Sequence, residues 1–256
     1  MNPAEFDHIA RAERDFWWYR GMREILFRVL DAVELPGAGA GASVLEAGCG
    51  TGHLSESLEQ RYGWRMTALD LDRAGLEYAR GHGLARLLQG DVTALPFSGA
   101  VFDAMVSMDV LVHLPRGEEA CALSEFARVL KPGGVLVLRV AAFDALRSRH
   151  SEFVRERQRF TRAGLLSGLE LAGFEVRRAT YLNSLLTPVA LFKFRVWEPL
   201  TRAPVASGVS AGRVGETSWL DRLLYLPLRA EAAWIGRGGS FPFGQSLLVL
   251  GRKRRT

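Results

Sequence analysis

Cysteine is scarce in this sequence, with only Cys49 and Cys121 among 256 residues. Two cysteines cannot form the disulfide framework that holds small secreted proteins together. We therefore expect a protein of the reducing cytoplasm. Cys49 lies inside a glycine-rich stretch, and we interpret it as a small residue that fills space there.

Long hydrophobic runs are also missing. The nearest approach, from Leu185 to Val196, is interrupted by Lys193 and Arg195, and a membrane-spanning helix needs about 20 apolar residues. The first five residues, Met1 to Glu5, lack the basic and then apolar run of a signal peptide. These absences predict a soluble protein with no membrane span, which leaves only weak association with a membrane surface.

Acidic residues are scarce in the second half of the chain. The net charge is +5, but residues 1–138 contain 13 Lys and Arg against 19 Asp and Glu, whereas residues 139–256 contain 20 against 9. A basic half suits an acidic substrate, a membrane surface or nucleic acid, although scattered solvated arginines explain the same numbers. Since no zinc module or stripe of alternating aromatic and basic residues occurs, we expect no nucleic-acid partner.

Apolar periodicity divides the chain into elements. Apolar residues at spacings of three, four and seven predict a helical cap within residues 1–36. The glycine-rich stretch 36–41 cannot continue a helix and is interpreted as a connector. Strand and helix patterns then alternate, which predicts a parallel sheet with helices on both faces. The expected strands are 43–47, 65–69, 85–89, 102–108, 134–140, 174–181 and 246–250, and the expected helices are 51–60, 73–81, 118–130 and 162–172.

A long segment without strand pattern, residues 183–240, separates the last two expected strands. Such a length is uncommon for a loop in a compact domain. We interpret it as a mostly helical insertion, or lid, over the active site. One domain of residues 1–256 is therefore expected, with its core in residues 43–182 and 241–252.

A glycine-rich loop follows the first expected strand. The strand ends in Val44-Leu45-Glu46, and glycines stand at positions 48, 50 and 52 before a helix. Residues without Cβ let the backbone turn sharply and touch a ligand. A dinucleotide site would place its third glycine where His53 stands, and Glu46 would repel a pyrophosphate. The loop instead suits a ligand with a positively charged group.

Two further acids follow the next two strands. Asp70 lies 18 residues after Gly52, where a carboxylate can accept two hydrogen bonds from a ribose diol. Asp91 can accept a hydrogen bond from an adenine amino group, with Leu71 and Val92 against the two faces of the ring. Each acid alone also fits a helix cap or turn. Together with the glycine loop, the acids predict one crevice at the carboxyl edge of the sheet.

These motifs together resemble the class I S-adenosylmethionine-dependent methyltransferases, specifically the small-molecule group of methyltransferase type 11. The resemblance covers about residues 43–140 and implies a Rossmann-like, doubly wound α/β sheet of seven mostly parallel strands with an antiparallel last strand. Residues 13–25 resemble the cap helix of bacterial members linked to small-molecule or cell-surface glycan biosynthesis. The segments that carry the resemblance are Val44-Leu45-Glu46-Ala47-Gly48-Cys49-Gly50-Thr51-Gly52, Ala68-Leu69-Asp70-Leu71-Asp72, Gln89-Gly90-Asp91-Val92, Leu95-Pro96-Phe97, Phe102-Asp103, Val110-Leu111-Val112-His113-Leu114 and Leu130-Lys131-Pro132-Gly133-Gly134.

The resemblance implies S-adenosylmethionine as cofactor, S-adenosylhomocysteine as product, and no metal. It implies that Glu46 and the loop hold the methionine part, Asp70 the ribose and Asp91 the adenine end, with backbone near the amino acid group. The cofactor-binding residues expected on this basis are Glu46, Gly48, Cys49, Gly50, Gly52, Asp70, Leu71, Asp91, Val92, Ser107 and Met108.

The implied reaction is in-line attack of an O, N or C nucleophile of a small molecule on the sulfonium methyl group. Orientation supplies much of the acceleration, and a base is needed only if the nucleophile must lose a proton. His113 is the best candidate for this base, with a structural role in its turn as the alternative. No group of His and Cys residues has metal-ligand spacing in the sequence.

Several polar residues are candidates for contact with the acceptor, which we expect to be a natural product or a glycan-related or lipid-like molecule. Arg139 interrupts an apolar strand; a salt bridge with a cap acid or solvent exposure would also explain it. The insertion's apolar residues either form a greasy lid or pack against one another. The candidates are Tyr19, Arg20, Arg139, Arg157, Arg159, Tyr181 and Asn183.

Two other functions compete with methyl transfer. A nicotinamide-dependent dehydrogenase is disfavoured because glycine is missing at position 53. A catalytically silent, cofactor-binding partner subunit would keep the same loop and acids. The sequence does not distinguish a monomer from a homodimer.

Overall fold

The computed structural model describes residues 3–35, 41–201 and 219–255. The chain forms two compact units. Unit 1 comprises residues 1–33, 142–156 and 180–247, and unit 2 comprises residues 34–141, 157–179 and 248–256. None of the described helices is long and apolar enough to cross a membrane.

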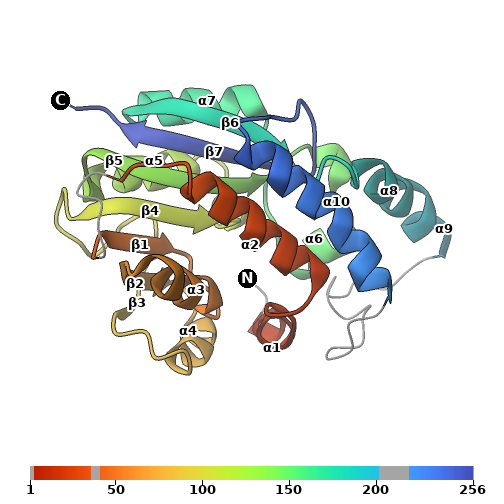
Figure 1. Cartoon of the computed structure of the whole chain (residues 1–256), viewed down its shortest axis with the longest axis horizontal. Helices are drawn as coiled ribbons and strands as arrows, with labels where there is room; N and C mark the ends of the chain where they lie inside the picture. The colour runs from red at the N-terminus through yellow and green to blue at the C-terminus, as the bar shows by residue number, and fades with distance from the viewer. Residues whose placement is uncertain (1–2, 36–40, 202–218, 256) are drawn as a thin grey trace. The chain divides into compact units, whose positions relative to one another are not determined.

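A seven-stranded sheet, most of it in unit 2, has the order β3-β2-β1-β4-β5-β7-β6 (Figure 1). β1 pairs in parallel with β2 and β4, β2 with β3, and β4 with β5, whereas the last strands are antiparallel. The expected fold class is therefore confirmed. The strands are β1 Ser43–Ala47, β2 Arg65–Asp70, β3 Leu87–Gln89, β4 Phe102–Met108, β5 Leu130–Ala141, β6 Phe174–Leu182 and β7 Ser246–Lys253.

The central strands are apolar on both faces, as a sheet covered by helices on both sides requires. In β4 every residue except Met108 is buried, and in β5 all residues from Gly133 to Val140 are buried. Strand order reverses between β1 and β4, and the carboxyl ends of the strands at such a switch point are where open α/β sheets bind their ligands. The helical elements of unit 2 are α3 His53–Tyr62, α4 Arg73–Arg80, η1 Leu111–His113, α5 Glu118–Val129 and α7 Arg162–Leu171.

Unit 1 is mainly helical, and its α2 and α10 lie side by side (Figure 1). Leu228 of α10 is fully buried, and Gly21 of α2 gives it room, since a Cβ at Gly21 would overlap the leucine side chain. The helical elements of unit 1 are α1 Pro3–Ala12, α2 Trp17–Leu30, η2 Asp144–Leu146, α6 Arg149–Phe153, α8 Thr187–Phe192, η3 Lys193–Trp197, α9 Glu198–Thr201 and α10 Trp219–Gly236.

The cap and the insertion, which the sequence analysis treats as separate segments, belong to the same compact unit. The insertion is helical where it is described, and its residues 202–218 lie outside the described part. Its role as a lid over the active site stays a prediction. Residues 142–156, to which the sequence analysis assigns no element, contribute η2 and α6 to unit 1.

Candidate functional site

The glycine-rich loop connects β1 to α3 and is tied to the neighbouring strand. The backbone N–H groups of Gly48 and Cys49 both donate to the carbonyl of Leu69, at 2.7 and 2.9 Å. Leu69 is paired in register with Ala47, the last residue of β1. The loop therefore starts at a fixed position at the carboxyl edge of the sheet.

Two positions of this loop have no room for a side chain. Gly48 and Gly52 have φ values of 85° and 82°, a region that favours glycine. A Cβ at Gly48 would overlap the Val110 side chain, and one at Gly52 would lie 2.7 Å from the Cβ of Ala79. The loop thus runs close to both the β4–η1 connection and α4.

Glu46 lies one residue before the end of β1, and only 3% of its surface is exposed. Its carboxylate accepts a hydrogen bond from the hydroxyl of Ser55 in α3. A buried carboxylate requires such partners, because burying an unpaired charge away from water costs roughly several kcal/mol or more of folding free energy. The acid is therefore held in place by the helix that follows the glycine loop.

Asp70, the last residue of β2, is oriented by two backbone donors. Gly50 N–H donates to its Oδ2 at 2.7 Å, and Asp72 N–H donates to its Oδ1 at 2.8 Å. Burial raises the pKa of Asp70, although these two hydrogen bonds act in the opposite direction. Two carboxylates on adjacent strands, beside a glycine-rich loop, form a set of hydrogen-bond acceptors that fits a ligand with a cationic group and a diol.

The region expected to hold adenine lies after β2 and β3. Asp91 is exposed, and its Oδ1 accepts hydrogen bonds from the N–H and the hydroxyl of Thr93, both at 2.8 Å. Val92 is buried, whereas the side chain of Leu71 is 65% exposed directly after the strand. An exposed leucine beside Asp70 offers an apolar surface for a planar ring.

The end of β4 contributes Ser107 and Met108. The hydroxyl of the fully buried Ser107 donates to the carbonyl of Ala47 at 2.9 Å, which links the ends of β1 and β4. Asp109 follows with a φ of 56°, an uncommon conformation for a residue with a side chain. The backbone at the expected amino acid end of the ligand is thereby fixed by contacts from two strands.

Arg139 is buried in β5 and pairs with Asp109. Of the alternatives in the sequence analysis, the salt bridge is present, although its partner belongs to unit 2 and not to the cap. The other carboxylate oxygen of Asp109, Oδ1, is buried and has no hydrogen-bond partner among the described residues. Because this oxygen is shielded from solvent, it is out of reach of a ligand in this conformation.

His113 ends η1, the short turn after β4, and is half-buried. Its backbone N–H donates to the carbonyl of Val110 at 3.0 Å. Val110 is also the residue against which Gly48 packs. The turn that carries His113 is therefore in contact with the glycine loop, as its candidate role as a base requires.

The other predicted acceptor contacts fall in both units. Arg157 and Arg159 belong to unit 2 with Arg139, whereas Tyr19, Arg20, Tyr181 and Asn183 belong to unit 1. The guanidinium of Arg20 lies 4.3 Å from the ring centroid of Tyr225, and Tyr181 is buried and stacked on Phe143. Asn183 Oδ1 is the second buried atom without a hydrogen-bond partner among the described residues.

One side-chain cluster is missing from the sequence analysis. Nδ1 of His53 and Nδ1 of His82 lie 3.2 and 2.8 Å from the same carboxylate oxygen of Glu56. Two imidazoles and one carboxylate within 4.8 Å of one another can hold a divalent transition metal. The spacing His53 to Glu56 is a helical one, but nothing in the sequence indicates that His82 joins them.

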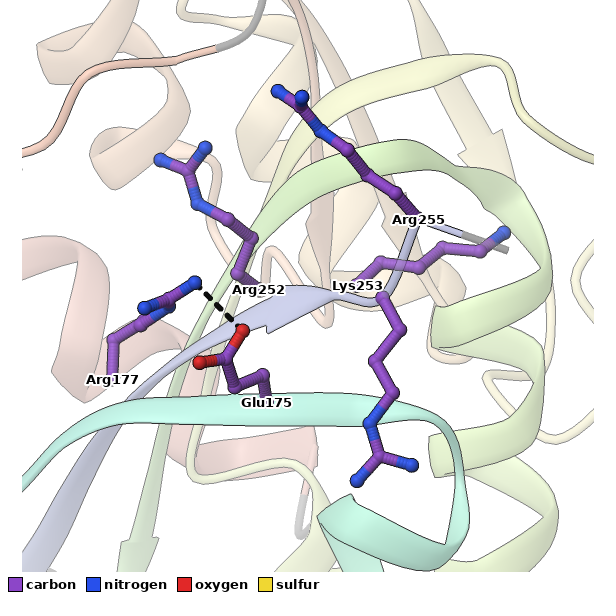
Figure 2. Close-up of a pocket in the computed structure, with 6 residues that line it drawn as sticks. Glu175, Arg177, Arg252, Lys253 and Arg255 are labelled. Atoms are coloured by element: carbon purple, nitrogen blue, oxygen red, sulfur yellow. Dashed lines mark hydrogen bonds and ion pairs between the residues drawn. The ribbon is translucent and has the colours of Figure 1, made fainter.

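A basic pocket of about 590 Å³ lies in unit 2 where β6 begins and β7 ends (Figure 2). Lys253 Nζ donates to the carbonyl of Leu130, the first residue of β5, at 2.8 Å. The pocket is therefore at the edge where β5 begins, opposite the carboxylates of β1 and β2. Its lining residues are Glu175, Arg177, Arg252, Lys253, Arg254 and Arg255.

Comparison with known proteins shows that the chain is similar to methyltransferases. Residues 44–134 match the family model described as a methyltransferase domain. The chain is 30% identical over 212 residues to a malonyl-[acyl-carrier protein] O-methyltransferase of Serratia marcescens, an alignment that covers 81% of this chain and 79% of the relative. It is 36% identical over 149 residues to a ubiquinone biosynthesis O-methyltransferase of Xanthomonas oryzae, covering 54% and 61% of the two chains.

A solved structure supports the same fold. A methyltransferase of Haloferax volcanii, determined in complex with its activator protein, superposes with a TM-score of 0.61 at 20% identity and covers 98% of both chains. This chain spans only 61% of the length of the Xanthomonas relative.

Proposed function

Because the chain belongs to the class I S-adenosylmethionine-dependent methyltransferases, we propose that it methylates an oxygen of a small molecule of natural-product, glycan-related or lipid-like chemistry. The pair of carboxylates on β1 and β2, joined by the glycine loop, carries this proposal. The two relatives described above are named O-methyltransferases, which favours oxygen over nitrogen or carbon as the nucleophile. Family membership also removes the nicotinamide-dependent dehydrogenase as an alternative.

Each part of the site has a role in holding the cofactor. Glu46 and the backbone of Gly48, Cys49, Gly50 and Gly52 bind the methionine part, where the buried carboxylate offsets the cofactor's positive charge. Asp70 accepts hydrogen bonds from the ribose hydroxyls, since its ionised oxygens are acceptors only. The adenine end is held by Leu71, Asp91 and Val92, and the backbone of Ser107 and Met108 faces the amino acid group.

Bound S-adenosylmethionine supplies a methyl group that its sulfonium already activates. The protein's task is to hold an acceptor oxygen in line with that group, and orientation is worth up to about 7–11 kcal/mol. His113 takes up the proton if the acceptor is a hydroxyl group that must be deprotonated. Arg139, through its pair with Asp109, holds the turn that follows β4, where the acceptor would approach the methyl group.

Cofactor binding tests the first half of the proposal. We expect Asp70→Asn to weaken binding of S-adenosylmethionine by about tenfold or more, because hydrogen bonds to a charged acceptor are lost. Since the pKa of Asp70 is raised by burial, affinity should fall as the pH is lowered through that raised pKa, and Asp70→Asn should remove this dependence. Isothermal titration calorimetry measures both, with Asp7→Asn in α1 of unit 1 as the matched control.

Product formation tests the second half. Purified protein and S-adenosylmethionine with a labelled methyl group are incubated with hydroxyl- and carboxyl-bearing lipid-like and glycan-related molecules. Label recovered in a product with a new methyl ether or ester supports the proposal. Cofactor that binds tightly but never yields a methylated acceptor, while N- or C-methylated products are also absent, would point to a silent cofactor-binding subunit.

A further inference from the structure

The helical segment 187–201, formed by α8, η3 and α9, has its polarity reversed relative to a helix on the surface of a globular protein. Its buried side chains are Thr187, Ala190 and Glu198, which are small or polar. Large apolar side chains point outward instead, with Trp197 57% and Leu200 76% exposed. A surface helix usually buries its apolar stripe and exposes its polar face.

Polar contacts on the inner side hold this orientation. Thr187 Oγ1 donates to the carbonyl of Asn183 at 2.8 Å, and Glu198 accepts a hydrogen bond from the backbone N–H of Arg149 at 3.1 Å. Arg195 Nε donates to the carbonyl of Ala145 at 2.8 Å. Rotating the segment to bury its apolar face would break these bonds, so the outward apolar face is a feature of the folded unit.

The first half of α10 repeats the pattern in the same unit. Trp219, Leu223 and Leu226, at spacings of four and three, are all exposed, and Trp219 is 75% exposed. The opposite side of α10 packs on α2 through Leu228 and other buried residues. Exposed apolar area on this scale marks an interaction surface, because single scattered apolar residues are what monomeric proteins normally show.

The charges on these helices have one sign where they are exposed. Lys193, Arg195, Arg222 and Arg229 are exposed. Within residues 187–201 and 219–236, the acids are Glu198 and Glu231, which are buried, and Asp221, which is half-buried. Tryptophan and phenylalanine with interspersed Lys and Arg are the composition of elements that lie at the interface of an anionic bilayer.

We propose that the outward faces of residues 187–201 and 219–226 form a docking surface for a lipid bilayer with anionic headgroups. The apolar side chains enter the boundary between headgroups and acyl chains, and the exposed Lys193 and Arg222 contact the headgroups. None of the described helices can cross a membrane, so the segment lies on the surface and does not span it. This inference does not depend on the proposed methyl transfer, since it concerns binding without cofactor.

Vesicle binding by the full chain tests the proposal. We expect the protein to bind vesicles of phosphatidylcholine mixed with phosphatidylglycerol, and to bind vesicles of phosphatidylcholine alone more weakly. Phe192→Ser, Trp197→Ser and Leu200→Ser combined should lower the partition coefficient by at least about tenfold, since burial of large apolar side chains in the bilayer favours binding. Leu171→Ser is the matched control, because Leu171 is 87% exposed on α7 of unit 2.

Charge reversal separates the electrostatic part. Lys193→Glu with Arg222→Glu should reduce binding to the anionic vesicles and make it less dependent on salt, whereas Arg80→Glu on α4 should leave it unchanged. Brominated lipids should quench the fluorescence of wild-type protein more than that of Trp219→Phe. Circular dichroism confirms that each variant is folded.

Three results would overturn the proposal. The first is folded wild-type protein that fails to bind anionic vesicles at low salt. The second is binding that Leu171→Ser reduces as much as the triple variant does. The third is a concentration-dependent dimer, seen by sedimentation velocity, which the triple variant abolishes while vesicle binding is unaffected; the surface would then bind a second copy of the chain.

Discussion

Gly48 in the cofactor loop and Gly83 after α4 share a positive φ but differ in their surroundings. A Cβ at Gly48 would overlap Val110, whereas a Cβ at Gly83 meets nothing within 4 Å. Left-handed backbone costs a residue with a side chain about 1–2 kcal/mol at either position. Only Gly48 adds a steric clash, and the side chain involved lies next to the turn that carries His113.

We therefore expect Gly48→Ala to be more harmful than Gly83→Ala. Both variants should lose about 1–2 kcal/mol of unfolding free energy from backbone strain, and Gly48→Ala should lose more because of the clash with Val110. Gly48→Ala should also weaken S-adenosylmethionine binding by at least about tenfold as the loop shifts. Urea unfolding and calorimetry measure the two effects. Equal cofactor affinity in the two variants would show that the close approach to Val110 is unimportant for the site.

The residues of the candidate site were predictable to different degrees. Glu46 and Asp70 can be located from the sequence because both lie at the ends of apolar strands, and parallel strands end at one edge of a sheet. The pair between Asp109 and Arg139 joins residues 30 apart, and His82 meets Glu56 across 26 residues. No local periodicity reports such pairs, since they depend on how the elements pack.

Elements show the same contrast. The bounds of β1 and β4 agree with the sequence analysis because both strands are short apolar runs between clear turn signals. β5 begins at Leu130, four residues before the expected start, because residues 131–134 look like a turn but continue the strand, with a register shift in its pairing to β4. η2 and α6 have no amphipathic pattern long enough to indicate a helix.

Glu231 of α10 fixes the turn that precedes the segment 187–201. Its carboxylate is fully buried and accepts hydrogen bonds from the backbone N–H groups of Asn183 and Leu185, at 2.7 and 2.8 Å. Burial raises the pKa of Glu231, and these backbone bonds only partly oppose the shift. The folded protein therefore binds a proton more tightly at this position than the unfolded chain does.

This raised pKa predicts how stability depends on pH. The contribution of Glu231 is largest below the ordinary pKa of a glutamate, and it is lost as the pH rises through the raised pKa of the folded state. Glu231→Gln should remove that part of the dependence and cost about 1–3 kcal/mol of unfolding free energy through weaker acceptance of the backbone bonds. Urea unfolding of the wild type and of Glu231→Gln, from below the ordinary pKa of a glutamate to above the raised pKa, measures the two pH dependences. If the unfolding free energies of the two proteins change in parallel with pH, Glu231 is not the group responsible.

At the scale of the whole molecule, distant parts of the sequence supply one compact unit, which combines residues 1–33, 142–156 and 180–247. α2 and α10 lie side by side although about 190 residues separate them, and the sequence analysis gave no reason to pair the cap with the insertion. Their apolar patterns show that each helix has a buried face, but not which helix covers it. The close approach at Gly21 and Leu228 is one of the contacts that favour this pairing.

A double-mutant cycle at this contact tests whether the pairing holds unit 1 together. Gly21→Ala should be destabilising by about 1–3 kcal/mol, although alanine is normally the better helix former, because its Cβ would overlap Leu228. Leu228→Ala should cost about 2–5 kcal/mol, since it leaves a cavity at a fully buried position. In the double variant the smaller residue makes room for the new Cβ, so the total loss should be less than the sum by about 1 kcal/mol or more. Strictly additive losses in urea unfolding would mean that the two side chains do not meet, and the packing of α2 on α10 would then need another explanation.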